Sequence, residues 1–204
     1  MAISHSRAKL CASWSLVIIG GSYAEIAPRD RRALLLSSIR MFEELLGYLA
    51  AANVRFVVVG GVAVVIHGHA RLTVDLDLVL DLDPENVRRA IEALTARGLR
   101  PLLPVNAQDF ADADIRRQWV NTRNMQVFTM RDPHSPLLTI DLFATEPIPF
   151  ADLWARSETV SLGGGNVRVA SINDLIAMKR VASRPQDLVD IEKLEAIVRR
   201  RRGH

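Results

Sequence analysis

The chain has 204 residues, of which 49% are hydrophobic and 24% are charged, and its formal net charge is +3 at pH 7. This length and apolar content are enough to bury the core of one folded domain, which excludes an intrinsically disordered tail. The single cysteine, Cys11, excludes an intrachain disulfide and a thiolate metal site. We therefore expect a globular protein of a reducing compartment, and the predicted location is the cytoplasm.

Residues 1–30 are predicted to form a leader of uncertain order. Its apolar run, Leu16 to Ile19, is far shorter than the roughly 20 residues that a membrane helix needs. Arg7 and Lys9 precede this run, but no clear cleavage signal follows it, so a secretory signal is disfavoured. We expect no membrane partner.

Helical and strand periodicities alternate through the first half of the chain. They predict, in order, a helix over 31–52, a strand over 55–59, a short helix over 61–68, a strand over 73–80 and a helix from 84 to about 98. Asp83 supplies an N-cap for the last of these helices, and Pro84 suits its first position. The order of elements is typical of an α/β (α+β) fold with a small mixed sheet.

The second half continues the same pattern. It predicts a strand and then a helix near 111–120, strands over 125–130 and 137–143, a hairpin over 158–170 around three glycines, and helices over 171–181 and 185–200. We therefore expect a core domain over 31–170 and a C-terminal helical segment over 171–204 that packs on it.

Asp75 and Asp77 carry the strongest functional signal. Residues i and i+2 of a strand point the same way, about 7 Å apart along the chain, so the two carboxylates share one face. A hard divalent cation between them would turn this repulsion into attraction. The alternative is an edge strand with one solvated face. The upstream Gly60-Gly61 turn and a further acid, Asp141, within the apolar run 137–143 favour the metal site, because a carboxylate in an apolar strand is costly unless it is paired.

Lys179 falls in the middle of the apolar stripe of its helix, beside Leu175 and Ile176. Either its stem packs while the ammonium reaches water, or the ammonium serves a site in a cleft. Two other polar residues are expected to be structural. Asp187 would act in the first turn of the last helix and orient Lys179 or Arg184, and His67 would be packed or capping.

The block from Phe56 to Val79 is a strand, Gly-Gly, a short helix and then an apolar-Asp-apolar-Asp-apolar strand. It resembles the nucleotidyltransferase superfamily that includes DNA polymerase beta, and Asp141 matches the third carboxylate of that superfamily. The segment from Val62 to Arg71 looks like the branch that contains abortive-infection, toxin-antitoxin and antibiotic-modifying nucleotidyltransferases. The resemblance extends from about Ser38 to Ile197.

This resemblance implies an enzyme that transfers an NMP from an NTP to an acceptor hydroxyl and releases pyrophosphate. Asp75, Asp77 and Asp141 would be the catalytic residues and would hold two Mg²⁺ ions. The nucleotide phosphates would be bound by the residues Gly60, Gly61, Arg71, Thr73 and Lys179. Many members carry Gly-Ser at the turn, whereas Gly61 offers only its backbone, so the sequence departs from that pattern.

The acceptor is left open by the sequence. It could be tRNA, a protein hydroxyl or a small molecule, and a toxin-antitoxin or defence role with a cognate toxin or antitoxin partner is one hypothesis. Antibiotic nucleotidylation of the aminoglycoside type is the alternative among enzymes. A different class of function is a non-catalytic, antitoxin-like binding module that keeps the fold and binds a partner with Arg199 to Arg202 or with an apolar face.

Overall fold

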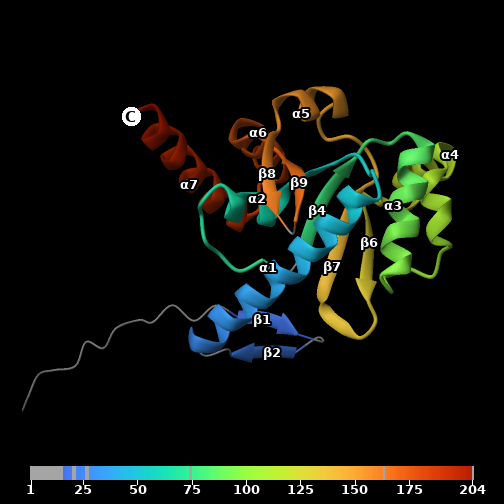
Figure 1. The fold of residues 1–204 in the computed structure, drawn as a ribbon, viewed down its shortest axis with the longest axis horizontal. Helices are drawn as coiled ribbons and strands as arrows, with labels where there is room; N and C mark the ends of the chain where they lie inside the picture. The colour runs from blue at the N-terminus through green and yellow to red at the C-terminus, as the bar shows by residue number, and fades with distance from the viewer. Residues whose placement is uncertain (1–15, 20–21, 26–27, 74, 163, 204) are drawn as a thin grey trace, which may run out of the picture.

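The protein is built around one seven-stranded mixed sheet. Figure 1 shows helices flanking this sheet. This computed structural model describes residues 16–19, 22–25, 28–73, 75–162 and 164–203. The strands are β3 (Phe56–Val58), β4 (Asp75–Leu80), β5 (Arg100–Pro101), β6 (Val127–Asp132), β7 (Ser135–Phe143), β8 (Glu158–Leu162) and β9 (Gly165–Val169). Their order across the sheet is β5-β6-β7-β4-β3-β9-β8. The mixed α/β fold expected from the sequence is confirmed.

Strand β4 lies in the interior of the sheet. It pairs antiparallel with β3 on one side and parallel with β7 on the other. The interpretation of the strand with Asp75 and Asp77 as an edge strand is therefore wrong. Because β4 has a paired strand on each side, Asp75 and Asp77 lie beside residues of the neighbouring strands and not at a solvated edge.

The helices are α1 (Pro28–Ala51), α2 (Gly60–Ile66), α3 (Pro84–Ala96), the 3₁₀ helix η1 (Ala107–Ala111), α4 (Ala113–Arg123), α5 (Phe150–Arg156), α6 (Ile172–Ala182) and α7 (Pro185–Arg202). All the helices except η1 and α5 lie close to the ranges predicted from the sequence. Asp83 caps α3 as expected, because its carboxylate accepts hydrogen bonds from the backbone N–H groups of Glu85 and Asn86 at 3.1 and 3.2 Å. Ser171 likewise caps α6 by accepting from the N–H of Asp174.

Three elements were not expected from the sequence. They are α5, η1 and a two-stranded antiparallel hairpin, β1 (Leu16–Ile19) with β2 (Ser22–Glu25). The hairpin falls inside the segment that was expected to be a leader. Each of these elements is short, and a helix of a single turn or two leaves too few residues for a periodicity to be recognised.

Aromatic packing anchors β6 from the face of the sheet that lies opposite the acidic residues. Phe128 is buried and stacks on Phe110 of η1, with ring centroids 4.6 Å apart, and on Trp119 of α4 at 5.7 Å. These contacts hold η1 and α4 against that face. No helix of the described part of the chain is both long and apolar enough to cross a membrane.

Candidate functional site

Three carboxylates, here called the carboxylate trio, share one face of the sheet. Parallel pairing places Asp77 of β4 directly beside Asp141 of β7, while Asp75 pairs with Thr139. The residues that alternate with them along β4, Leu76 and Leu78, are fully buried on the opposite face. The trio is therefore fixed by backbone register, as the alternation of Asp and Leu in the sequence suggested.

Crowding and burial perturb the acids of β4. The pKa of Asp77 is raised to about 6, mainly by burial and also by the charges of Asp141 and Asp75, while the Gly61 N–H and Lys179 oppose this rise. Burial and the charge of Asp141 also raise the pKa of Asp75. A carboxyl with a pKa of about 6 in a group of like charges is a common signature of a functional site.

The Gly60-Gly61 turn lies against this group. Gly60 has a φ of +60°, and a Cβ at this position would overlap the carboxylate of Asp77. The N–H of Gly61 donates to Asp77 Oδ2 at 3.4 Å. A glycine is therefore required at residue 60, both for its backbone conformation and for the close approach of an acid.

Thr73 and Arg71 occupy the space next to the Cα atom of Gly61. A Cβ at Gly61 would overlap the hydroxyl of Thr73 and lie 2.9 Å from Nη2 of Arg71. Thr73 is itself buried, and its hydroxyl donates to the carbonyl oxygen of Asp75 at 3.3 Å. The departure from Gly-Ser at this turn thus has a steric cause, since a serine side chain has no room here.

A buried ion-pair network joins the segment after α2 to the two C-terminal helices. Asp190 of α7 is fully buried, and it accepts a hydrogen bond from Arg71 Nη2 at 2.9 Å. Arg71 Nε also lies 2.9 Å from the other oxygen of Asp190, without the alignment of a hydrogen bond. Burial would raise the pKa of Asp190, but the hydrogen bond from Lys179 and the charge of Arg71 hold this pKa below its ordinary value.

Lys179 is the second cation of this network. Its ammonium lies 2.7 Å from Asp190 Oδ2 and donates to Asp187 Oδ1 at 2.9 Å. The side chain is only 8% exposed, so the interpretation in which the ammonium reaches water is wrong. Its charge acts on Asp77, whose pKa it lowers. Lys179 is therefore close enough to the carboxylate trio to affect it electrostatically.

Two residues expected to be structural have that role. Asp187 contacts both of the partners considered for it, because Oδ1 accepts from Lys179 and Oδ2 accepts from the backbone N–H of Arg184 at 3.2 Å. His67 is buried, and its Nε2 lies 2.8 Å from the carbonyl oxygen of Ala170. Both residues thus make the structural contacts that were expected of them.

Sequence reasoning missed one polar neighbour of the trio. Thr129 of β6 pairs directly with Asp141, and its hydroxyl donates to Asp141 Oδ1 at 2.6 Å. A threonine in an alternating strand carries no signal of its own. Only the pairing register of β6 with β7 identifies it.

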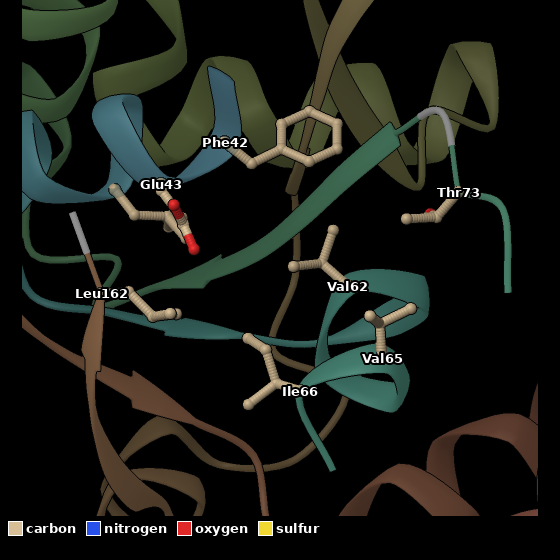
Figure 2. A pocket seen from close by; sticks show the side chains of 8 residues that line it. Phe42, Glu43, Val62, Val65, Ile66, Thr73 and Leu162 are labelled. Atoms are coloured by element: carbon tan, nitrogen blue, oxygen red, sulfur yellow. The ribbon is translucent and has the colours of Figure 1, made fainter. Parts of the chain in front are cut away.

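Figure 2 shows a small apolar cavity beside α2, which shares Val62 and Thr73 with the surroundings of the turn. Its volume is about 40 Å³, enough for only a few waters and far less than a nucleotide needs. Glu43 is the one charged residue at its wall. This cavity is therefore not a nucleotide site.

A metal ion fits the chemistry of this donor set. Asp75 and Asp77 offer hard oxygen ligands, and a divalent cation would offset the burial and the like-charge repulsion that raise their pKa values. Among the described residues, however, no three His, Cys, Asp or Glu side chains converge to enclose an ion by themselves. A cation held here would need further ligands, such as phosphate oxygens and water.

Comparison with known families identifies the enzyme class to which the chain is related. Residues 45–201 match the family model described as "Nucleotidyl transferase AbiEii toxin, Type IV TA system", and this match includes the turn, the trio and the ion-pair network. The chain belongs to this AbiEii family. Its members are nucleotidyltransferases, so the superfamily resemblance is confirmed, and this AbiEii protein is assigned to that enzyme class. No curated protein matches the sequence.

Solved structures agree with this assignment at the level of fold. The lincosamide antibiotic adenylyltransferase LnuA with bound lincomycin superposes with a TM-score of 0.50 at 14% identity, over 81% of this chain and 96% of that one. ANT(2")-Ia in complex with adenylyl-2"-tobramycin gives a TM-score of 0.50 at 14% identity, over 79% and 94% of the two chains. At such identities the likeness of these structures to this AbiEii protein concerns the fold alone.

Proposed function

We propose that this protein transfers a nucleotidyl group from an NTP to an acceptor hydroxyl, with Mg²⁺ as its metal. The observation that carries the proposal is the register that sets Asp77 beside Asp141, next to a glycine turn that the Asp77 carboxylate already touches. A non-catalytic binding module would gain nothing from retaining a crowded trio in which two acids have raised pKa values. The family match supports the enzyme class independently.

The binding roles follow from the charges. Mg²⁺ would be held by Asp75 and Asp77, with a second ion shared by Asp141, and it would supply neutralisation of the charge on the phosphates. Gly60 and Gly61 would offer backbone N–H groups to the same phosphates. Asp141, at the β7 side of the trio, would face the acceptor hydroxyl.

Arg71 and Lys179 would complete the phosphate site. The ammonium of Lys179 has three N–H donors, and its contacts with Asp187 and Asp190 account for two of them. A phosphate could therefore engage the third while the carboxylates keep the ammonium in place. Arg71, fixed by Asp190, would offer its remaining donors from the other side of Gly61.

The reaction is then an in-line displacement at the α-phosphorus. The acceptor oxygen forms a bond to this phosphorus as the bond to the bridging α,β-oxygen breaks, so pyrophosphate leaves and the proton of the acceptor hydroxyl is lost. The chain contributes mainly position and charge. Arg71 and Lys179 would stabilise the negative charge that develops on the departing pyrophosphate.

The test is transfer of label from each α-labelled NTP, with Mg²⁺, to total tRNA, to proteins of a cell lysate or to an aminoglycoside. Asp77→Asn should abolish the transfer. Asp81→Asn is the matched control, because Asp81 immediately follows β4 at the end away from the trio and pairs with Arg55. Transfer that survives Asp77→Asn, or that occurs equally without divalent metal, would contradict the proposal.

We also infer a toxin role in which a cognate antitoxin restrains this activity, from the family to which the chain belongs. Production of the protein alone in a bacterial host should then arrest growth, and production of the Asp77→Asn variant should not. Equal growth arrest by both proteins would show that any toxicity does not come from nucleotidyl transfer.

A further inference from the structure

The hydrogen bond between Thr129 and Asp141 is the one direct contact of the carboxylate trio with a side-chain hydroxyl of β6. The donor and acceptor lie 2.6 Å apart, which is short for a hydroxyl and typical of a charge-assisted bond to a carboxylate. Both residues are partly buried and lie directly opposite each other on paired strands. Opposed residues bring their Cβ atoms within about 5 Å, so the bond forms without distortion of either strand.

The position of Thr129 is fixed from the other face of the sheet. Its sequence neighbours Phe128 and Met130 are buried, and Phe128 is stacked on Phe110 and Trp119. A β-branched side chain on such an anchored strand has few rotamers available. The hydroxyl of Thr129 is therefore presented to Asp141 by a rigid support.

The bond divides the two oxygens of Asp141 between two roles. Oδ1 accepts from Thr129, and rotation of the carboxylate about its last torsion would break this contact. Oδ2 is left for a metal ion or for the acceptor side of the site. The same bond holds the charge of Asp141 at the place from which it acts on Asp75 and Asp77.

We propose that Thr129 is a positioning residue that orients Asp141 for the nucleotidyl transfer. The inference rests on the proposed function for the role of Asp141, but the orientation itself is a property of this chain. Residues that orient a metal ligand through a hydrogen bond typically contribute 10- to 100-fold in metal affinity or activity.

The test compares Thr129→Val, which removes the hydroxyl and keeps the shape, with Thr129→Ser, which restores it. Thr129→Val should lower kcat about 10- to 100-fold and change KM for the NTP by less than about 2-fold. Thr129→Ser should recover most of the lost kcat. Thr159→Val in β8 is the matched control, since Thr159 also makes a side-chain hydrogen bond on a strand but at the opposite edge of the sheet.

A second measurement does not depend on turnover. Mn²⁺ would be titrated into each variant by electron paramagnetic resonance in the presence of a non-hydrolysable α,β-methylene NTP, and Thr129→Val should bind Mn²⁺ about 10-fold more weakly. Thermal melts of the three variants establish that all are folded. Mn²⁺ affinity and kcat within 2-fold of wild type in Thr129→Val would overturn the inference.

Different results would contradict the proposed function and the positioning role of Thr129. A wild-type protein that binds Mn²⁺ with the nucleotide but transfers nothing to any acceptor counts against the proposed function. The Mn²⁺ titration of Thr129→Val then still decides the positioning role by itself.

Discussion

The carboxylate of Asp77 is buried beside two other acids, which raises its pKa to about 6 from an ordinary value of 3.8. A group whose pKa is raised on folding holds its proton more tightly in the folded state. Stability from this group is therefore present below about pH 4, and it is lost as the pH rises towards about 6. At neutral pH without metal, the ionised carboxylate of Asp77 lowers the free energy of unfolding.

Replacing Asp77 by Asn should therefore stabilise the metal-free protein while it abolishes transfer. The gain at pH 7.5 should be on the order of 2 kcal/mol, and it should vanish near pH 4, where both side chains are neutral. Urea unfolding in EDTA at the two pH values measures it. Asp81→Asn, which removes an ion pair with Arg55, should show no such gain. A destabilised Asp77→Asn protein at pH 7.5 would contradict the expected cost of this charge.

Gly60 is limited by space as well as by backbone conformation. Gly60→Ala should destabilise the protein by clearly more than Gly68→Ala, which isolates the cost of a positive φ because nothing lies within 4 Å of a Cβ at Gly68. We expect about 1–2 kcal/mol for the control and more for Gly60→Ala, whose Cβ overlaps the Asp77 carboxylate. Equal losses in urea unfolding would mean that Asp77 moves aside freely.

At the scale of elements, Asp190 connects three segments. Asp190 lies on α7 and contacts both Arg71, in the segment between α2 and β4, and Lys179 of α6. Both cations are at most 19% exposed, so each depends on this carboxylate for compensation of its charge. The last two helices are thus part of the site, although they follow the sheet in the sequence.

Asp190→Ala should destabilise the protein by about 3–5 kcal/mol, because it leaves the buried Lys179 and the partly buried Arg71 with only Asp187 between them. It should also weaken NTP binding, since Arg71 and Lys179 would lose their fixed positions. Glu192→Ala is the matched control on the same helix, where a largely exposed side chain pairs only with Lys193, and it should cost below about 0.5 kcal/mol. Denaturant unfolding of both variants measures the difference. A loss as small as that of Glu192→Ala would show that water replaces the network without cost.

The periodicity of the sequence was enough to predict the strands that bring the trio together. The alternation of Asp and Leu in β4 fixes which face the acids share, and Asp141 lies in an equally apolar strand. The partner of Asp141 could not be foreseen in the same way. Continuing the pairing of Asp132 with Ser135 would set Gln126 opposite Asp141, but an irregularity after Arg131 shifts the register and brings Thr129 there.

Burial was the second property that the sequence left open. The periodicity of α6 correctly places Lys179 on its apolar stripe. It does not decide whether the ammonium reaches water or serves a cleft, because the partners of Lys179 lie on another helix. Asp187 and Asp190 come within hydrogen-bond distance only once α7 packs against α6. Contacts of this kind depend on how helices pack, which local periodicity does not encode.

At the scale of the whole molecule, the site joins segments that are far apart in the chain. The turn at Gly60, the strands β4 and β7 and the helices α6 and α7 all contribute to it. A ligand that contacts several of them binds only the folded state, so its binding energy adds to the free energy of unfolding. This coupling provides a test that needs no acceptor.

Mg²⁺ together with a non-hydrolysable NTP should raise the melting temperature, whereas either alone should have a much smaller effect. At a ligand concentration about 100 times Kd the stabilisation is about 2.7 kcal/mol, which corresponds to a shift of roughly 5–10 °C for a chain of this size. In Asp77→Asn the joint effect should disappear, because the pair of carboxylates proposed to hold the metal is broken. In Asp81→Asn it should remain, since that residue lies away from the trio. A full shift with NTP alone would mean that the turn and the two cations bind phosphate without help, and that the trio is not where the metal acts.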